Sequence, residues 1–262
     1  MTDVVVSAEW LDENREGLRI VDVREAWEFE GIGHVPGATN VPFDAFRALD
    51  GDEGMLPGAD VFAELLGEAG IERDDGIVAY DDTHGVFAAR FLVTAELYGH
   101  DRAKLHLLDG DYSAWGRSHE TTSEPTAIEP VTYALERPDD TVLVDREAVE
   151  AAIDDEDTLL VDTREAWEFA AGHIPGAVQL DWRAFVDNES RGLKEREAIE
   201  GVLESRGVAH NRRLLLYCNT ARRISHTYLV LRHLGFEDLG FYEGSLTEWE
   251  NAGGAMETGE AE

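Results

Sequence analysis

Cysteine and lysine are scarce in this chain of 262 residues, which has one cysteine, Cys218, and two lysines, Lys104 and Lys194. A single cysteine excludes an internal disulfide and a zinc site made of several thiolates. The chain also lacks an apolar run of membrane-spanning length, and its first residues show no basic stretch followed by an apolar core. We therefore expect a cytoplasmic protein without a secretory signal, a membrane helix, a metal or a cofactor.

Basic residues are few beside the acidic ones. The chain has 56 Asp and Glu against 22 Lys and Arg, a formal net charge of −34 at pH 7. A surface of this charge repels nucleic acid and anionic lipid, so neither is expected as a partner. Such a charge serves either general solubility or adaptation to a salt-rich cytoplasm, where screening removes most of the self-repulsion. We favour the second explanation, a halophilic protein.

What the chain does contain is an internal duplication. VDVREAWEF at residues 21–29 recurs as VDTREAWEF at 161–169, and GHVPGA at 33–38 recurs as GHIPGA at 172–177. Three weaker matches follow in the same order, separated by small gaps. The chain is therefore a tandem repeat, in which Cys218 of the second copy aligns with Asp81 of the first.

Short apolar segments alternate with amphipathic helical patterns in both copies. This alternation predicts an α/β fold, each copy forming a mainly parallel sheet of about five strands with helices on both faces. Ser7 and Asp145 are expected to cap the first helix of each copy. The expected strands lie at 4–6, 19–22, 39–41, 77–80 and 104–108 in the first copy, and at 142–144, 159–162, 178–180, 214–217 and 239–242 in the second.

Composition suggests where the domains divide. The stretch from 120 to 140 holds three of the seven prolines and few periodic apolar positions. We expect a first domain over 1–122, a linker over 123–140 and a second domain over 141–262. The polar, acidic tail beyond Trp249 is expected to fray.

The candidate site is the six-residue stretch Cys218-Asn219-Thr220-Ala221-Arg222-Arg223. An apolar strand pattern precedes it and a helical pattern follows it, so Cys218 is expected at the carboxyl end of a strand and beside a helix N-terminus. The helix dipole and the two arginines favour the nucleophilic thiolate. The alternative is that Cys218 is a buried small apolar residue, as free cysteines often are.

The surroundings of Cys218 support chemistry. From Arg206 to Phe236 the chain has no Asp or Glu, although it is strongly acidic overall. Six arginines fall in that window. A basic region in an acidic protein points to a small anionic substrate.

The paired VDxR…E segments, the paired GHxPGA segments and the Cys218 loop resemble the rhodanese (sulfurtransferase) family in its two-domain form. The resemblance covers nearly the whole chain. It implies tandem rhodanese-like domains, an inactive N-terminal one and a catalytic C-terminal one. Asp81 in place of cysteine matches the inactive copy, because a carboxylate cannot carry sulfur.

The resemblance also implies a reaction. Cys218 takes a sulfane sulfur from a donor such as thiosulfate, forms a persulfide, and passes the sulfur to cyanide or a thiol in ping-pong kinetics. The loop residues Asn219, Thr220 and Ala221 would surround the substrate, and their N–H groups would hold the negative persulfide. Arg223 is the first choice as anion clamp, and Arg222 the second.

Some residues depart from the family pattern. Ala221 stands where many members have glycine, and Asn219 and Thr220 stand where many thiosulfate-using members have a basic residue. Glu168 stands where many have a donor-binding arginine. We expect thiosulfate as the donor because a compact dianion suits two guanidinium groups. The alternatives are 3-mercaptopyruvate as donor and a non-enzymatic persulfide carrier or binding module.

Other polar residues are interpreted as scaffold. Asp162, Arg164 and His173 all have counterparts in the copy without cysteine, so an ion pair and a turn explain them. His226 is expected to pack or cap. A phosphatase is disfavoured, because such enzymes have arginine at the sixth position after the cysteine and this chain has Ile224 there.

Overall fold

The computed structural model describes residues 4–48, 55–136, 138 and 141–259. The chain forms two compact units. The first unit consists of Met1–Asp140 with Asp187–Leu193, and the second consists of Thr141–Val186 with Lys194–Glu262. None of the helices in the described ranges is long and apolar enough to cross a membrane.

The sheet of the first unit has five parallel strands in the order β1-β5-β4-β2-β3. Its strands are almost entirely buried, as a parallel sheet covered on both faces requires. The strand bounds are β1 Val5–Val6, β2 Leu18–Asp22, β3 Ala38–Asn40, β4 Gly76–Tyr80 and β5 Leu105–Leu108. All five expected strands are confirmed.

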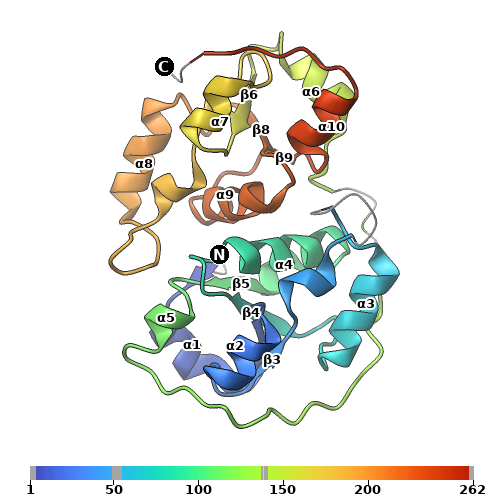
Figure 1. Cartoon of the computed structure of the whole chain (residues 1–262), viewed down its shortest axis with the longest axis vertical. Helices are drawn as coiled ribbons and strands as arrows, with labels where there is room; N and C mark the ends of the chain where they lie inside the picture. Colours follow the sequence, from blue (N-terminus) through green and yellow to red (C-terminus); the bar gives the residue numbers. More distant parts are fainter. Residues whose placement is uncertain (1–3, 49–54, 137, 139–140, 260–262) are drawn as a thin grey trace. The chain divides into compact units, whose positions relative to one another are not determined.

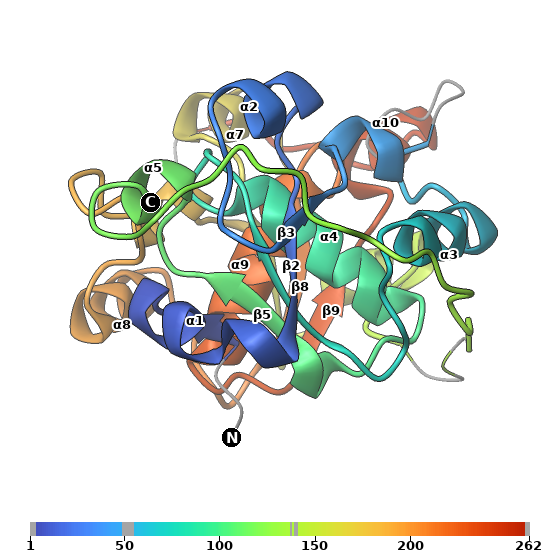
Figure 2. The same cartoon turned by 90° about the horizontal axis from the view of Figure 1, so that it is seen from below.

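Helices cover both faces of this sheet. On one face, a core cluster joins Leu11, Tyr112 and Trp115 to strand residues such as Val78. On the other face, α4 packs against β4 and β5 (Figure 1). The bounds are α1 Ala8–Asn14, α2 Ala26–Gly31, α3 Ala59–Glu68, α4 Val86–Leu97 and α5 Tyr112–Trp115, with 3₁₀ turns η1 Arg15–Gly17, η2 Phe43–Phe46 and η3 Arg102–Lys104. Helix α1 lies beside β5, where Trp10 contacts His106 (Figures 1 and 2).

The second unit repeats this architecture with a four-stranded parallel sheet in the order β7-β6-β8-β9. Val149 of α6 and Trp249 of α10 share a core cluster with Leu160 and Leu215. The strands are β6 Thr158–Asp162, β7 Val178–Gln179, β8 Arg213–Tyr217 and β9 Leu239–Phe241. The helices are α6 Arg146–Ala152, α7 Ala166–Ala171, α8 Arg196–Ser205, α9 Arg222–His233 and α10 Ser245–Asn251, with the 3₁₀ turn η4 Trp182–Phe185.

One expected strand of the second unit does not form. The segment 142–144 makes a single parallel bridge, between Leu143 and Phe241. Two backbone hydrogen bonds hold it, from the Phe241 nitrogen to the Val142 oxygen and from the Val144 nitrogen to the Phe241 oxygen. The segment cannot extend further because Asp145 already caps α6, accepting a hydrogen bond from the Ala148 nitrogen at 2.9 Å.

The other expected cap is also present, since Ser7 Oγ accepts from the Trp10 nitrogen at 3.1 Å. The tail as far as Gly259 does not fray as expected, and residues 260–262 lie outside the described residues. The backbone of Glu257 exchanges two hydrogen bonds with His173, and the Gly259 nitrogen donates to the Ala170 oxygen. The expectation was wrong because it considered only composition, whereas an acidic segment can still pair its backbone with a neighbouring loop.

The segment from Thr122 through the described part of the predicted linker makes contacts with the rest of the first unit. Thr122 exchanges two backbone hydrogen bonds with His34, Thr126 Oγ1 donates to the Ala38 oxygen, and the Val131 nitrogen donates to the Gly67 oxygen. Residues 137, 139 and 140 of the predicted linker lie outside the described residues. Backbone pairing, the Thr126 hydroxyl and the buried Tyr133, whose hydroxyl lies 2.9 Å from His100 Nδ1, together position this segment.

Candidate active site at the Cys218 loop

Cys218 directly follows β8, and the next helix, α9, begins only four residues later at Arg222. The loop proper is therefore Cys218 to Ala221, while Arg222 and Arg223 belong to the first turn of the helix. Ala221 makes this tight connection by adopting a left-handed backbone, with φ of 61°. That conformation is strained for any residue with a Cβ. Cys218 is only 1% exposed.

The beginning of α10 holds the Cys218 backbone in place. Ser245 Oγ accepts a hydrogen bond from the Cys218 nitrogen at 3.2 Å, and the Leu246 nitrogen donates to the Cys218 oxygen at 2.9 Å. Thr247 Oγ1 donates to the Asn219 oxygen at 2.8 Å. Sequence analysis did not identify these three residues. The duplication places Gly244 opposite Gly110 of the first copy, but this match alone does not indicate the side-chain contacts of the residues that follow it.

Arg223 lies in an ion pair with Glu168 of α7. Its Nη2 donates to Glu168 Oε1 at 2.9 Å and its Nη1 donates to Oε2, while Asn219 Nδ2 donates to Oε1 at 2.9 Å. Burial alone raises the pKa of the Glu168 carboxyl, but hydrogen bonds from Arg223, the Glu165 backbone and Asn219 lower it to about 2. Glu168 is thus ionised at neutral pH. Arg222 is exposed.

Arg164 and Asp162 form a buried ion pair beside the loop. The Arg164 Nη2 atom lies 2.6 Å from Asp162 Oδ2 and 2.6 Å from the Gly172 oxygen. Arg24 and Asp22 repeat this arrangement in the first unit, with Arg24 Nη2 2.7 Å from the Gly33 oxygen. The shared pair is scaffold, as the duplication predicted.

One contact distinguishes the two copies of this pair. Arg164 Nη1 lies 3.5 Å from Asn219 Oδ1 in the catalytic candidate loop. The same atom of Arg24 has no hydrogen-bond partner among the described residues, and the Arg24 guanidinium instead lies over the Tyr112 ring at 3.7 Å. Arg164 therefore connects the scaffold to the Cys218 loop.

Asp81, the counterpart of Cys218, shows what the corresponding loop of the first unit holds. Asp81 Oδ1 accepts hydrogen bonds from the backbone nitrogens of Thr83 and Gly85, at 2.7 and 2.8 Å. Its Oδ2 accepts from those of Phe87 and Ala88, at 2.8 and 3.1 Å. Burial raises the pKa of the Asp81 carboxyl, and these four N–H groups oppose the rise. The loop thus surrounds an anionic group with backbone donors.

The second unit presents the equivalent donors without such a side chain. Gly85 and Ala221 both stand in the left-handed conformation directly before a helix of 12 residues, so the two helix starts correspond. The first unit's loop is one residue longer. The nitrogens matching the four Asp81 donors are those of Thr220, Ala221, Arg223 and Ile224. In the described ranges, no acceptor outside the helix's own backbone is recorded for them.

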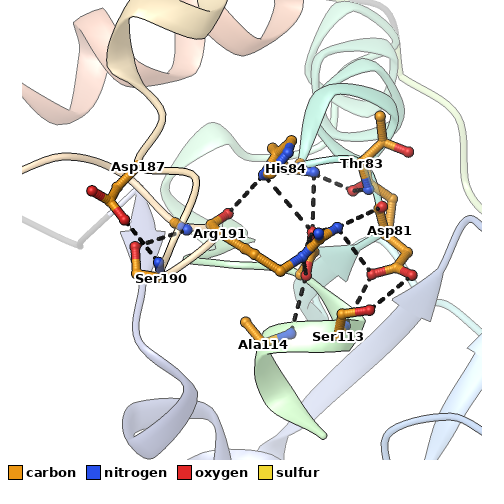
Figure 3. Close-up of polar contacts among 12 residues, drawn as sticks. Asp81, Thr83, His84, Ser113, Ala114, Asp187, Ser190 and Arg191 are labelled. Carbon is orange, nitrogen blue, oxygen red and sulfur yellow. Dashed lines mark hydrogen bonds and ion pairs between the residues drawn. The ribbon is translucent and has the colours of Figure 1, made fainter. Parts of the chain in front are cut away.

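A loop from the second half of the sequence closes the Asp81 region. Arg191 Nε lies 2.7 Å from Asp111 Oδ1, and its Nη2 lies 3.1 Å from the Asp82 oxygen. His84 Nδ1 lies 3.2 Å from the Arg191 oxygen. Figure 3 shows the Arg191 side chain extending into this cluster near Ser113. In the repeat, Asp111 of the first unit corresponds to Ser245 of the second. Asp111 binds Arg191, whereas Ser245 binds the Cys218 backbone, so these equivalent positions make different contacts.

The histidines noted in the sequence have structural contacts. His34 and His173 each stack on a phenylalanine ring, with ring centroids 3.7 and 3.6 Å apart. His226 is buried against the edge of Trp182. No cluster of three or more metal-ligating side chains occurs among the residues described.

Comparisons with known proteins agree with the duplicated fold. The rhodanese-like domain model matches residues 7–118 and 145–252. A Mycobacterium bovis protein named "Putative thiosulfate sulfurtransferase 1" is 31% identical over 273 residues, covering 97% of this chain and 96% of that protein. A Haloferax volcanii protein named "Putative thiosulfate sulfurtransferase" is 29% identical over 277 residues, covering 97% of this chain and 95% of that protein.

Solved structures share the fold. SseA from Escherichia coli, described as a 3-mercaptopyruvate sulfotransferase, superposes with a TM-score of 0.81 at 24% identity, covering 93% of this chain and 99% of that one. The anaerobic ergothioneine biosynthesis enzyme of Chlorobium limicola gives a TM-score of 0.87 at 20% identity, covering 98% of this chain and 70% of that one. The chain therefore belongs to the rhodanese family of sulfurtransferases, with one rhodanese-like domain in each half.

Proposed function

We propose that the protein is a thiosulfate sulfurtransferase in which Cys218 of the second domain carries the sulfur and the first domain is inactive. The observation that carries this proposal is the comparison of Asp81 with Cys218. In the first unit four backbone N–H groups bind the Asp81 carboxylate. In the second unit the matching N–H groups belong to the loop and the first helical turn that follow the Cys218 thiol, where they would stabilise an anionic sulfur.

In the first half-reaction, the Cys218 thiolate attacks the outer sulfur of thiosulfate. The new bond joins Cys218 Sγ to that sulfur, the sulfur–sulfur bond of the donor breaks, and sulfite leaves with the electron pair. The product is a Cys218 persulfide with its charge on the terminal sulfur. In this proposal the N–H groups of Thr220, Ala221 and the first turn of α9 hold that charge.

In the second half-reaction, cyanide or a thiolate attacks the terminal sulfur. The persulfide bond breaks and returns its electron pair to Cys218 as thiolate, while the acceptor leaves as thiocyanate or a new persulfide. Both nucleophiles attack as anions, so no general base is needed, and both leaving groups depart as stable anions, so no general acid is needed either. Asn219, Arg222 and Arg223 are the proposed substrate-binding side chains.

A second donor is favoured by one specific observation. The Arg223 charge is already balanced by Glu168, which weakens the argument that two free guanidinium groups select a dianion. A singly charged donor such as 3-mercaptopyruvate, the substrate in the description of the Escherichia coli neighbour, is therefore the alternative. A non-enzymatic persulfide carrier would use the same Cys218 but show no turnover.

The test is intact-protein mass spectrometry after incubation with thiosulfate. The wild type is expected to gain one sulfur atom, to lose it on addition of cyanide, and to release thiocyanate. Cys218→Ser is the control and should gain nothing. A wild type that gains no sulfur from either donor contradicts the proposal. Sulfur loading without turnover on cyanide or thiols supports the carrier instead.

A further inference from the structure

Glu168 makes two separate sets of contacts. It is the third residue of α7, where its Oε2 accepts a hydrogen bond from the Glu165 nitrogen at 3.0 Å and completes a capping box. The same carboxylate binds Arg223 and Asn219 of the Cys218 loop. The Glu168 side chain is only 11% exposed, and that of Arg223 is 21% exposed.

The internal duplication shows which of these contacts the fold requires. Glu28, the counterpart of Glu168, makes the same capping box by accepting from the Glu25 nitrogen at 3.1 Å. Asp82 and Phe87 occupy the positions that correspond to Asn219 and Arg223, and neither has a positively charged side chain that could pair with Glu28. Capping the helix therefore explains why both copies have glutamate. It does not explain the bonds of Glu168 to the loop.

The bonds to the loop change the charge that a substrate meets. Two arginines lie beside the Cys218 loop, and each forms an ion pair with one carboxylate. Arg164 pairs with Asp162, and Arg223 pairs with Glu168. These four side chains together carry no net charge. An anion that approaches Arg223 must share it with Glu168 or displace the Glu168 carboxylate, and the cost grows with the charge of the anion.

Resting on the proposed function, we propose that Glu168 determines which sulfur donors this site accepts. By pairing with Arg223 it lowers the affinity for doubly charged donors such as thiosulfate, relative to singly charged ones such as 3-mercaptopyruvate. Glu168 acts through Arg223 and Asn219 and is a specificity-determining residue. Removing its charge while keeping its shape should turn the preference toward the dianion.

The kinetic test compares kcat/KM for the two donors, with one acceptor, in the wild type, Glu168→Gln and Glu28→Gln. Glutamine still accepts the capping hydrogen bond, so both variants should fold. Glu168→Gln should raise the ratio of thiosulfate to mercaptopyruvate activity about tenfold, because one unit charge is removed near the dianion. Glu28→Gln should leave the ratio unchanged. An unchanged ratio in Glu168→Gln, or an equal loss with both donors, overturns the proposal.

A binding measurement separates this inference from the reaction itself. In the Cys218→Ser background, calorimetric titration with thiosulfate should show about tenfold tighter binding when Glu168→Gln is added, at the lowest salt in which the protein is folded. Tighter binding in this background, combined with a wild type that gains no sulfur from either donor, would contradict the proposed function and support the role of Glu168. If the wild type gains sulfur on Cys218 but Glu168→Gln changes neither the affinity for thiosulfate nor the donor ratio, the proposed function is supported and the role of Glu168 is contradicted.

Discussion

Ser245 Oγ accepts a hydrogen bond from the backbone nitrogen of Cys218 at 3.2 Å, and both residues are buried. Ser245→Ala removes this acceptor and leaves the buried Cys218 N–H group without its hydrogen-bond partner. Because an unsatisfied buried donor costs about 1–3 kcal/mol, the free energy of unfolding should fall by about that amount. The rate of sulfur loading should fall as well, since the loop is less firmly held.

Urea denaturation and single-turnover mass spectrometry measure the two effects. Ser205→Ala is the matched control, because the Ser205 hydroxyl makes an exposed hydrogen bond to the Val202 oxygen far from the loop. That control should change stability by less than about 0.5 kcal/mol. Loading at the wild-type rate in Ser245→Ala would show that this bond does not position Cys218.

Asp81→Asn should destabilise the first unit. The carboxylate accepts four backbone hydrogen bonds. The amide keeps one acceptor oxygen and turns an NH₂ group toward two N–H donors, so we expect a loss of about 2–4 kcal/mol. Hydrogen exchange of the amides of Thr83, Gly85, Phe87 and Ala88 reports the loss locally. Unchanged protection of these amides would contradict the role assigned to the carboxylate.

Arg191→Met tests the pairing of Arg191 with Asp111. Asp111 is fully buried, so removing its partner leaves an uncompensated charge and should cost about 3–5 kcal/mol. Arg213→Met removes an exposed arginine that pairs with the exposed Asp238, and should cost less than about 0.5 kcal/mol. Thermal unfolding of both variants compares them. Equal effects would mean that the Asp111 pair contributes no more than a surface pair.

Salt should stabilise the protein. The 34-charge excess of acid over base produces self-repulsion in the folded state, and screening shortens its range from about 10 Å at 0.1 M salt to about 3 Å at 1 M. The unfolding temperature should therefore rise between these two concentrations of potassium chloride. Differential scanning calorimetry measures it. A protein that is more stable in the low salt would refute the proposed salt adaptation.

The pair of Glu168 and Arg223 predicts how stability depends on pH. The folded pKa of Glu168 is about 2, below the ordinary value of 4.5. A depressed carboxyl pKa stabilises the folded state fully above the ordinary value, and the contribution is lost as pH falls toward the folded one. The stability difference between the wild type and Glu168→Gln, about 1 kcal/mol for a partly exposed pair, should hold down to about pH 5 and shrink below it.

Denaturant unfolding at a series of pH values measures that difference, and Glu28→Gln against wild type provides the baseline. A wild-type advantage that stays constant down to about pH 3 would contradict the assigned titration.

Local pattern alone determined much of this protein. The repeats, the parallel α/β fold, the caps at Ser7 and Asp145, and the position of Cys218 at a strand end all depend on residues close together in the chain. Periodicity, capping and strand–loop–helix order are short-range properties, so they can be predicted without coordinates. The strand expected at 142–144 did not form, because Asp145 directly after it caps α6 and ends the extended segment.

Only the tertiary structure decided what surrounds the thiol. It paired Arg223 with Glu168, brought Ser245 to the Cys218 nitrogen, and assigned the Arg191 loop to the first unit. These partners lie tens of residues apart, and no periodicity links them. Each pairing depends on which strand ends and helix starts lie side by side in the fold. It also depends on which side chains there can form ion pairs and hydrogen bonds with one another.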